Sequence, residues 1–589
     1  MGNYYTSERH TQILIALLKE HGIKNIVASP GSTNVCLVGS LQQDPYFNIY
    51  SSVDERSGCF IACGLAAETG EPVAITCTGS TASRNYIPGL TEAYYRHLPV
   101  LAITSSQHLG RAGNLYPQFI DRASQLNDMI NESVQIEPVN TDEDIWACEV
   151  KINRALIALK ANGGGPAHIN LVSTYSKDYS VKELPSVKKI DFVDYHDEKP
   201  EILKYHHVAL LVGVHGRWSD ELSEEVEKFC KKFDAVVLQY HACNYKGDFG
   251  VNFALSASIS HFENPLAKPD LIIYFGSVAR YKTGMDKADM WRVSLDGNVS
   301  DPEKTLTKVF RMNEVDFFKY YNSLDIDRSE IACAENGYAR LWQKQYEELL
   351  SKVPELPFSN VWVAKNLINK LPDGCVLHLA GSNTARSWNF FKLPKGVECY
   401  SNDGTMGIDG QVSALIGESL ASPNRIHFGA VGDLTFFYDM NSLGNRHIGK
   451  NIRLLVVNNG KGAEFKLYKH PAYDFGEQGD NYMAAAGHYG NKSPNLIKHY
   501  AEDLGYEYMC ARDEKEFLDN LEHFAMSELS DKSMIFEVFT DSKDESDAIY
   551  IMDHLIQTVS GASKDVAKNA IKKIAGEKGL KAVKSFLGK

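Results

Sequence analysis

The fold is indicated by two stretches of sequence, Val431-Gly-Asp-Leu-Thr-Phe-Phe-Tyr-Asp439 and Leu454-Leu-Val-Val-Asn-Asn-Gly460. Asp433 precedes Asn459 by 26 residues, a spacing typical of one βαβ crossover. We expect Gly432 and Asp433 to end one strand, residues 435–447 to form the helix and residues 452–457 to form the next strand. Both polar side chains would then lie at the carboxyl edge of a parallel sheet, where open α/β folds bind ligands.

The chemistry of these side chains favours a hard cation. Carboxylate, amide and backbone carbonyl oxygens suit Mg²⁺ or Ca²⁺, and Mg²⁺ commonly completes its coordination with phosphate oxygens. The pair therefore predicts an anchor for a diphosphate group. The alternative is that Asp433 caps the following helix and Asn458-Asn459 form a turn after the strand.

A second polar junction lies near the other end of the chain. Residues 47–53 are predicted to form a strand and residues 56–68 a helix, with Asp54 and Glu55 between them. From the residues alone, Asp54 would be the N-cap and Glu55 a first-turn acid favoured by the helix dipole.

Several motifs together resemble thiamine diphosphate enzymes, and more narrowly the SEPHCHC synthases of the menaquinone pathway. They keep the family order over about residues 10–470: Ser29-Pro-Gly-Ser32, Val53-Asp-Glu-Arg56, Tyr400-Ser-Asn402, Gly407-Ile-Asp-Gly410 and Gly432-Asp-Leu434. The resemblance implies three parallel-sheet α/β domains and a C-terminal helical tail. It also implies an enzyme that decarboxylates a 2-oxo acid on thiamine diphosphate and passes the carbanion to an acceptor.

The resemblance assigns roles by position. Glu55 matches the carboxyl group that hydrogen-bonds N1′ of the aminopyrimidine and so promotes removal of the C2 proton. Asp433, Asn459 and the carbonyl of Lys461 match the Mg²⁺ ligands, and Gln118 matches a glutamine near the reactive carbon. The remaining positions that match cofactor contacts are Asn85, Ile408, Gly432 and Leu434.

Candidate substrate residues lie in the loops around these motifs. Ser382 and Arg386 match a serine and an arginine that contact substrate in the family. Capping or loop roles are the alternative for such residues, Asn85 included. The other candidates are Ser32, Thr33, Arg84, His108 and Glu464.

Three arginines expected from the family are missing. Thr33 and Asp403 occupy two of their positions, and Thr104-Ser-Ser-Gln-His108 stands where the family has Asp-Arg-Pro. Loss of a guanidinium from a carboxylate clamp removes roughly 1.5–3 kcal/mol, and Asp403 would add repulsion. We therefore expect an acceptor other than isochorismate, with the new basic groups suited to an anionic donor or acceptor.

Two other functions remain open on the sequence. One is a simple 2-oxo acid decarboxylase that releases an aldehyde. The other is a non-catalytic cofactor-binding protein or regulatory subunit.

Composition agrees with an ordinary globular enzyme. The chain has 589 residues, is 44% apolar and 23% charged, and carries a net charge of −14, which argues against a nucleic-acid surface. Its eleven cysteines include no Cys-x-x-Cys pair, which favours buried thiols in a reducing cytoplasm. No apolar run is long enough to span a bilayer, so we expect a cytoplasmic protein.

The domain organisation follows from the alternation of predicted strands and helices. We expect a pyrimidine-binding domain over 1–180, a central domain over 181–345 and a diphosphate and Mg²⁺ domain over 346–545, with residues 174–206 as a linker. In relatives the glutamate domain faces the metal domain of a neighbouring subunit. The resemblance therefore implies a homodimer or homotetramer with the active site at the subunit interface.

The tail over 546–589 is not explained by the resemblance. Its lysine-rich part, residues 564–589, has apolar residues spaced for an amphipathic helix. Such a helix could contact an anionic membrane surface, dock on the enzyme or stay frayed.

Overall fold

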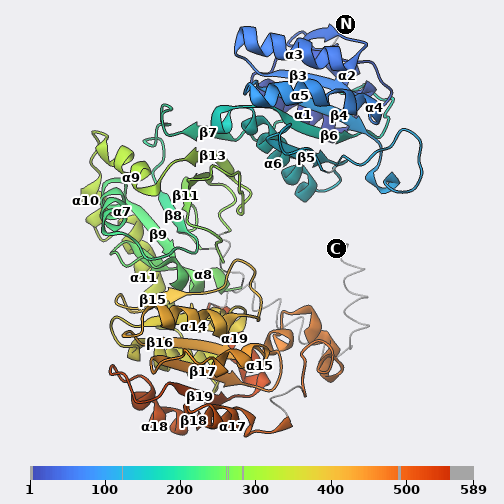
Figure 1. Cartoon of the computed structure of the whole chain (residues 1–589). Helices are drawn as coiled ribbons and strands as arrows, with labels where there is room; N and C mark the ends of the chain where they lie inside the picture. Colours follow the sequence, from blue (N-terminus) through green and yellow to red (C-terminus); the bar gives the residue numbers. More distant parts are fainter. Residues whose placement is uncertain are drawn as a thin grey trace, which may run out of the picture. The chain divides into compact units, whose positions relative to one another are not determined.

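The computed structural model describes residues 4–122, 124–260, 262, 264–280, 284–487 and 492–556 (Figure 1). The chain forms two compact units. The first contains Met1–Glu201 and Asp289–Asn313, and the second contains Ile202–Ala288 and Glu314–Lys589.

The first unit is built on a six-stranded parallel sheet with the order β2-β1-β3-β4-β6-β5. Its strands are short apolar runs, and neighbouring residues of one strand point to opposite faces. Ile26 of β1 packs in the cluster with helices α1 and α6, whereas Val27 packs in the cluster with α3 and α5. The strands of this sheet are β1 (Asn25–Ala28), β2 (Asn48–Ser51), β3 (Val73–Cys77), β4 (Val100–Ser106), β5 (Glu132–Ile136) and β6 (Ala167–Val172).

Helices cover both faces of this sheet. Gly89 permits close packing of α5 on α3, because a Cβ atom there would lie 2.5 Å from the Cys59 sulfur. The helices of this unit are α1 (Arg9–Glu20), α2 (Val35–Leu41), α3 (Glu55–Thr69), α4 (Thr81–Asn85), α5 (Ile87–Tyr95), η1 (Leu109–Arg111), α6 (Asp142–Ala158) and η2 (Ala161–Gly163).

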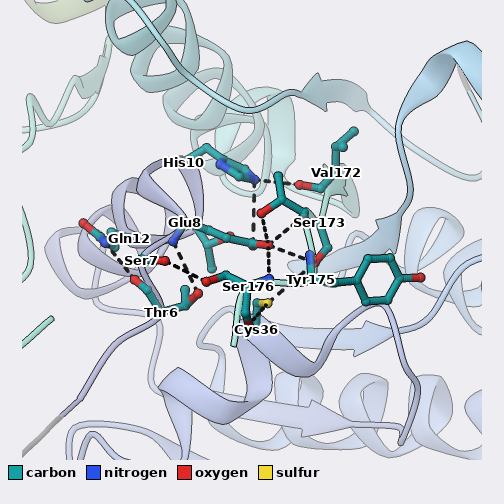
Figure 2. A network of polar contacts seen from close by, with 12 residues as sticks. Thr6, Ser7, Glu8, His10, Gln12, Cys36, Val172, Ser173, Tyr175 and Ser176 are labelled. Carbon is teal, nitrogen blue, oxygen red and sulfur yellow. Dashed lines mark hydrogen bonds and ion pairs between the residues drawn. The ribbon is translucent and has the colours of Figure 1, made fainter. Parts of the chain in front are cut away.

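A buried carboxylate fixes the chain where it leaves this sheet (Figure 2). Glu8 accepts hydrogen bonds from the Thr174 backbone N–H at 2.6 Å, the Thr174 hydroxyl at 2.8 Å and the Ser173 hydroxyl at 3.1 Å. Burial alone would raise the pKa of Glu8, but hydrogen bonds from Thr174 and Thr11 hold it below its usual value. The ionised side chain therefore ties the segment after β6 to the start of α1.

The predicted linker over 174–206 is more ordered than expected. It contains β7 (Asp191–Asp194), which pairs in parallel with β13 (Leu306–Arg311), and Val181 forms an antiparallel bridge with Tyr5. β12 (Asp289–Ser294) pairs with the other side of β13.

The second unit contains two groups of parallel strands. Four strands of the middle region have the order β10-β9-β8-β11, and the C-terminal sheet has the order β15-β14-β16-β17-β19-β18. This C-terminal order repeats that of the first six strands of the chain, so β16 corresponds to β3 and β14 to β1. The strands are β8 (Val208–Val212), β9 (Ala235–Gln239), β10 (Gly250–Asn252), β11 (Leu271–Phe275), β14 (Val376–Leu379), β15 (Glu398–Tyr400), β16 (His427–Gly432), β17 (Ile452–Asn458), β18 (Glu507–Ala511) and β19 (Met534–Phe539).

Helices follow most of these strands, as βαβ connections require. They are α7 (Asp220–Phe233), η3 (His241–Cys243), α8 (Ala254–Ser258), α9 (Glu314–Ser323), α10 (Ser329–Cys333), α11 (Tyr338–Leu350), α12 (Asn360–Leu367), η4 (Ile368–Lys370), α13 (Asn383–Trp388), α14 (Gln411–Ala421), α15 (Asp433–Asp439), η5 (Met440–Gly444), η6 (Ala463–Lys466), η7 (Pro471–Gly479), α17 (Leu496–Asp503), α18 (Glu514–Phe524) and α19 (Ser542–Asp553).

The fold class is the predicted one, with three parallel-sheet α/β regions. The helix expected over 435–447 is shorter than predicted, because α15 ends at Asp439 and a 3-10 helix follows it. The limits at residues 180, 345 and 545 remain predictions, and the predicted tail helix over 564–589 lies outside the described residues. Within the described part of the chain, no helix is both long and apolar enough to cross a bilayer.

All eleven cysteines are free thiols, and nine of them are buried. Cys333 is exposed and Cys510 is half-buried.

Candidate active site

Glu55 is the first residue of α3, directly after the carboxyl end of β2. Asp54 is the N-cap, since its carboxylate accepts from the Arg56 N–H at 3.0 Å and from the Ser57 hydroxyl at 2.8 Å. This confirms the predicted cap. Because Asp54 satisfies the helix end, the half-buried Glu55 carboxylate does not have to do so.

Asn85 meets Glu55 at this edge. Its side-chain amide donates to Glu55 Oε2 at 3.0 Å. Asn85 ends α4, and the turn that leads into α4 holds Ser80 at a φ of 64°. Non-glycine residues with positive φ are strained and gather at functional sites. The structure thus brings together two of the predicted site residues from separate elements.

Thr33, which stands where the family has an arginine, lies beside this turn. It is buried; its hydroxyl lies 2.6 Å from that of Thr78, and it donates to the Ser105 carbonyl at 2.9 Å. The Gly79 N–H donates to the same hydroxyl at 3.2 Å. Thr33 therefore joins its own loop to the loop after β3 and to the end of β4, while its neighbour Ser32 is exposed.

The other candidates of the first unit are exposed: Arg84 lies in α4, and His108 and Gln118 lie in the segment after β4. Arg84 donates to the Asp121 carbonyl at 3.2 Å, and His108 accepts from the Gly110 N–H at 3.1 Å. Gln118 is exposed, with a φ of 61°. The positive φ marks Gln118 as a second strained position of this edge.

The sequence reading missed Arg122, which follows Gln118 by four residues. It is 6% exposed, and its Nε and Nη1 atoms have no hydrogen-bond partner in the described part of the chain. Burial lowers its pKa to about 10. Sequence offered only a basic residue in a loop, and nothing in it indicated burial.

Asp433 occupies the equivalent edge of the C-terminal sheet. β16 and β17 pair in parallel with Gly432 opposite Val457, so Asp433 and Asn459 follow neighbouring strand ends, as predicted. Asp433 is 3% exposed. Burial raises its pKa to about 7, although backbone N–H groups of Leu434 and Gly460 favour the ionised form.

The loop after β17 is folded by its own side chains. Asn458 donates to Glu537 at 2.6 Å and accepts from the Gly460 N–H at 3.2 Å. Asn459 accepts from the Lys461 N–H at 3.4 Å, and Lys461 Nζ pairs with Asp480 at 2.7 Å. The Lys461 ammonium is thereby held on Asp480, while its backbone carbonyl belongs to the turn after Asn459.

The donor set suits a divalent oxygen-seeking cation. Asp433 forms no ion pair with a described side chain, and a buried carboxylate without a counter-ion gains most from a bound cation. Among the described residues no group of three or more His, Cys, Asp or Glu side chains could hold a metal. The site would therefore combine one carboxylate with amide, carbonyl and phosphate oxygens, a set of ligands that Mg²⁺ commonly has in proteins.

Ser382, Arg386 and Glu464, three of the candidate substrate residues, converge at this edge. Ser382 donates to Glu464 Oε2 at 2.8 Å. Arg386 binds both carboxylate oxygens, through Nη1 at 3.0 Å and Nη2 at 3.1 Å. Arg386 and Glu464 line a cavity of about 330 Å³. The described residues also border a larger cavity of about 770 Å³, but it contains none of the predicted site residues.

Asp403 does not act as the expected free repulsive charge. It is 2% exposed, forms a close ion pair with Arg280, and accepts from the Ser401 hydroxyl at 2.7 Å. The expectation of repulsion was wrong, because an arginine distant in sequence neutralises the carboxylate. Ile408, by contrast, is 40% exposed, so it is accessible to a ligand as its predicted supporting role requires.

Comparison with known proteins defines the class. Residues 9–127 match the family model described as "Thiamine pyrophosphate enzyme, N-terminal TPP binding domain". A Rhodococcus jostii thiamine diphosphate-dependent 4-hydroxybenzoylformate decarboxylase is similar in structure, with a TM-score of 0.40 and 16% identity over 90% of this chain and 99% of that one. The family match makes residues 9–127 a domain of the thiamine diphosphate-dependent enzymes.

Curated relatives narrow this class. The 2-succinyl-5-enolpyruvyl-6-hydroxy-3-cyclohexene-1-carboxylate synthase of Bacteroides fragilis is 31% identical, covering 92% of this chain and 98% of the relative. The synthase of the same name from Bacteroides thetaiotaomicron is 28% identical, covering 94% and 99%. The chain belongs to this SEPHCHC synthase family. It catalyses thiamine diphosphate-dependent decarboxylation of a 2-oxo acid with transfer of the carbanion to an acceptor.

Proposed function

We propose that Asp433, Asn459 and the Lys461 carbonyl hold Mg²⁺ against the diphosphate of the cofactor, and that Glu55 activates its aminopyrimidine ring. The observation that carries this proposal is the Asn85–Glu55 hydrogen bond of 3.0 Å at a sheet edge. It presents an oriented carboxylate where the family needs one.

Each residue has a distinct task in this proposal. Bound thiamine diphosphate supplies the electron sink that stabilises the carbanion left when CO2 departs. Glu55 exchanges a proton with N1′ of the ring, and Asn85 fixes the direction of that carboxylate. Gly432 and Leu434 would help to hold the diphosphate beside Asp433, Ile408 would support the ring system, and Gln118 would act near the reacting carbon.

We propose a homodimer or homotetramer with the active site at the subunit interface. Val53 is 81% exposed two residues before Glu55, and Phe60 and Ile61 of α3 are 45% and 46% exposed. Large apolar side chains gathered around a site are typical of a surface that is covered on association. The cover would be the metal-binding half of a neighbouring protomer. Eleven free thiols suit a reducing compartment such as the cytoplasm.

We propose that the acceptor is not isochorismate. The Thr33 hydroxyl donates to a backbone carbonyl, Arg386 is bonded to Glu464, and Asp403 is paired with Arg280. Ser32, Arg84 and His108 are exposed, and they would contact a 2-oxo acid or its acceptor.

The test uses the full chain with thiamine diphosphate and Mg²⁺ and a panel of 2-oxo acids, with CO2 release as the readout. Release that depends on both cofactors, followed by a carbon-carbon adduct with an acceptor other than isochorismate, supports the proposal. An aldehyde as the sole product would make the chain a simple decarboxylase. Absence of CO2 from every acid would favour a cofactor-binding or regulatory protein.

A further inference from the structure

The Arg386 clamp is closed by a carboxylate of the protein itself. A guanidinium binds a substrate carboxylate best through two parallel N–H bonds, and Glu464 already occupies both at 3.0 and 3.1 Å. Ser382 donates to the same carboxylate at 2.8 Å. Glu464 thus takes the donors that a substrate carboxylate would need.

Glu464 is held in its ionised form. Burial would raise its pKa, but the positive charge and hydrogen bonds of Arg386 and the hydrogen bond from Ser382 hold it below its usual value. The pair is also only partly open to solvent, with side-chain exposures of 32% for Arg386 and 28% for Glu464. Displacement of Glu464 would therefore leave a charge that water compensates poorly.

The rest of the cavity is balanced in charge as well. Lys469, which lines its wall, pairs with Asp553 at 2.9 Å, and Asp553 is itself buried. Ile549 and Tyr550 of α19 supply apolar surface beside these pairs. A carboxylate of the substrate in this cavity would add net negative charge next to Glu464 and Asp553. An uncharged polar group would add none.

We propose that Glu464 is a specificity-determining residue that fills the Arg386 clamp, so that this subsite takes an uncharged polar group of the substrate rather than a carboxylate. The inference rests on the proposed function in one respect, namely that Arg386 faces the substrate. It names the chemistry of the group that reaches Arg386, which the proposed function leaves open.

The test is a binding measurement by calorimetry on the full chain loaded with thiamine diphosphate and Mg²⁺, and it needs no turnover. The probes are glutarate and glutaramate, which differ by replacement of one carboxylate with an amide. The wild type should bind glutaramate at least tenfold more tightly than glutarate. Equal affinities, tighter binding of glutarate, or no binding of either probe would overturn the proposal.

Substitution then locates the effect. Glu464→Gln should tighten glutarate binding at least tenfold, because Arg386 loses its internal carboxylate, and Glu464→Gln combined with Arg386→Gln should lose that gain. Glu477→Gln, an exposed acid on the adjacent η7, is the matched control and should leave both affinities unchanged. If Glu464→Gln is less stable to heat than the wild type, the comparison of the two probes on the wild type still decides. If the variant is folded and binds glutarate no more tightly than the wild type, the proposal fails.

This result is independent of the wider proposal. Lack of CO2 release would contradict the proposed function even where the two probes are discriminated. Normal CO2 release without discrimination would contradict only the role of Glu464.

Discussion

The side-chain amide of Asn85 donates a 3.0 Å hydrogen bond to Oε2 of Glu55. The bond connects the end of α4 with the start of α3, two elements that are held by separate strands of one sheet. One carboxylate oxygen is thereby oriented by a neutral donor rather than neutralised by a cation. This arrangement suits a carboxyl group that must exchange a proton.

Asn85→Ala should therefore reduce turnover by a larger factor than it weakens cofactor binding. Removal of a hydrogen bond to a charged group costs about 1.5–3 kcal/mol, which corresponds to roughly ten- to hundredfold in rate. Steady-state CO2 release and cofactor titration check this. Asn140→Ala, an exposed asparagine before α6, is the control, and an equal loss in both variants would contradict a role for the Glu55 contact.

Asp433 should make the cofactor-free protein less stable as pH rises. Its pKa is about 7 in the folded chain against an ordinary 3.8, so between these values the folded state holds a proton that the unfolded chain has lost. The free energy of unfolding should fall across this window, by about 1.4 kcal/mol per unit of pKa difference at most. Urea denaturation at pH 5 and pH 7.5 measures the slope.

Asp433→Asn should flatten that slope but not abolish it, because buried Glu545 also has a pKa raised to about 7 by burial. In the wild type, protons compete with Mg²⁺ for Asp433, so the Mg²⁺-dependent affinity for thiamine diphosphate should increase from pH 6 to pH 8. A variant that keeps this increase would rule out Asp433 as the metal ligand.

Removal of one member of the Arg280–Asp403 pair should destabilise the fold much more than replacement of both. Both side chains are almost fully buried, so Arg280→Met leaves an uncompensated carboxylate and should lower the free energy of unfolding by roughly 3–5 kcal/mol. Arg280→Met with Asp403→Leu should recover most of that loss. Chemical denaturation of the two variants provides the measurement, and a double variant as unstable as the single one would contradict the assignment.

Arg122→Met should stabilise the cofactor-free protein. The buried guanidinium has two nitrogen atoms without partners in the described chain, and unsatisfied buried donors cost roughly 1–3 kcal/mol. A higher thermal midpoint for the variant is the expected outcome. Destabilisation would mean that Arg122 has a bound counter-ion.

The sequence predicted the elements that depend on local pattern. The apolar run of β17 and the capped start of α3 were located to within two residues, because burial and capping leave a signal in neighbouring residues. β7 was missed, since its two apolar residues lie between two aspartates in a charged segment.

Charge pairing was not predictable in the same way. Asp403 pairs with Arg280, which is 123 residues away in sequence, and Arg386 pairs with Glu464, which is 78 residues away. Such pairs depend on which loops the sheet brings together, which periodicity does not encode. Strand spacing indicated Asp433 and Asn459, and resemblance indicated Glu55 and Asn85, whereas the contacts of all four required the structure.

Whether Glu55 activates the bound cofactor can be measured as C2 proton exchange of thiamine diphosphate on the Mg²⁺-loaded enzyme. General acid–base contributions of this kind amount to roughly 10²–10⁴-fold. Exchange in Glu55→Ala, followed by NMR of acid-quenched samples in deuterated buffer, should be slower than in the wild type by at least that lower bound while diphosphate binding is retained. Exchange at the wild-type rate in a variant that still binds the cofactor would contradict the account.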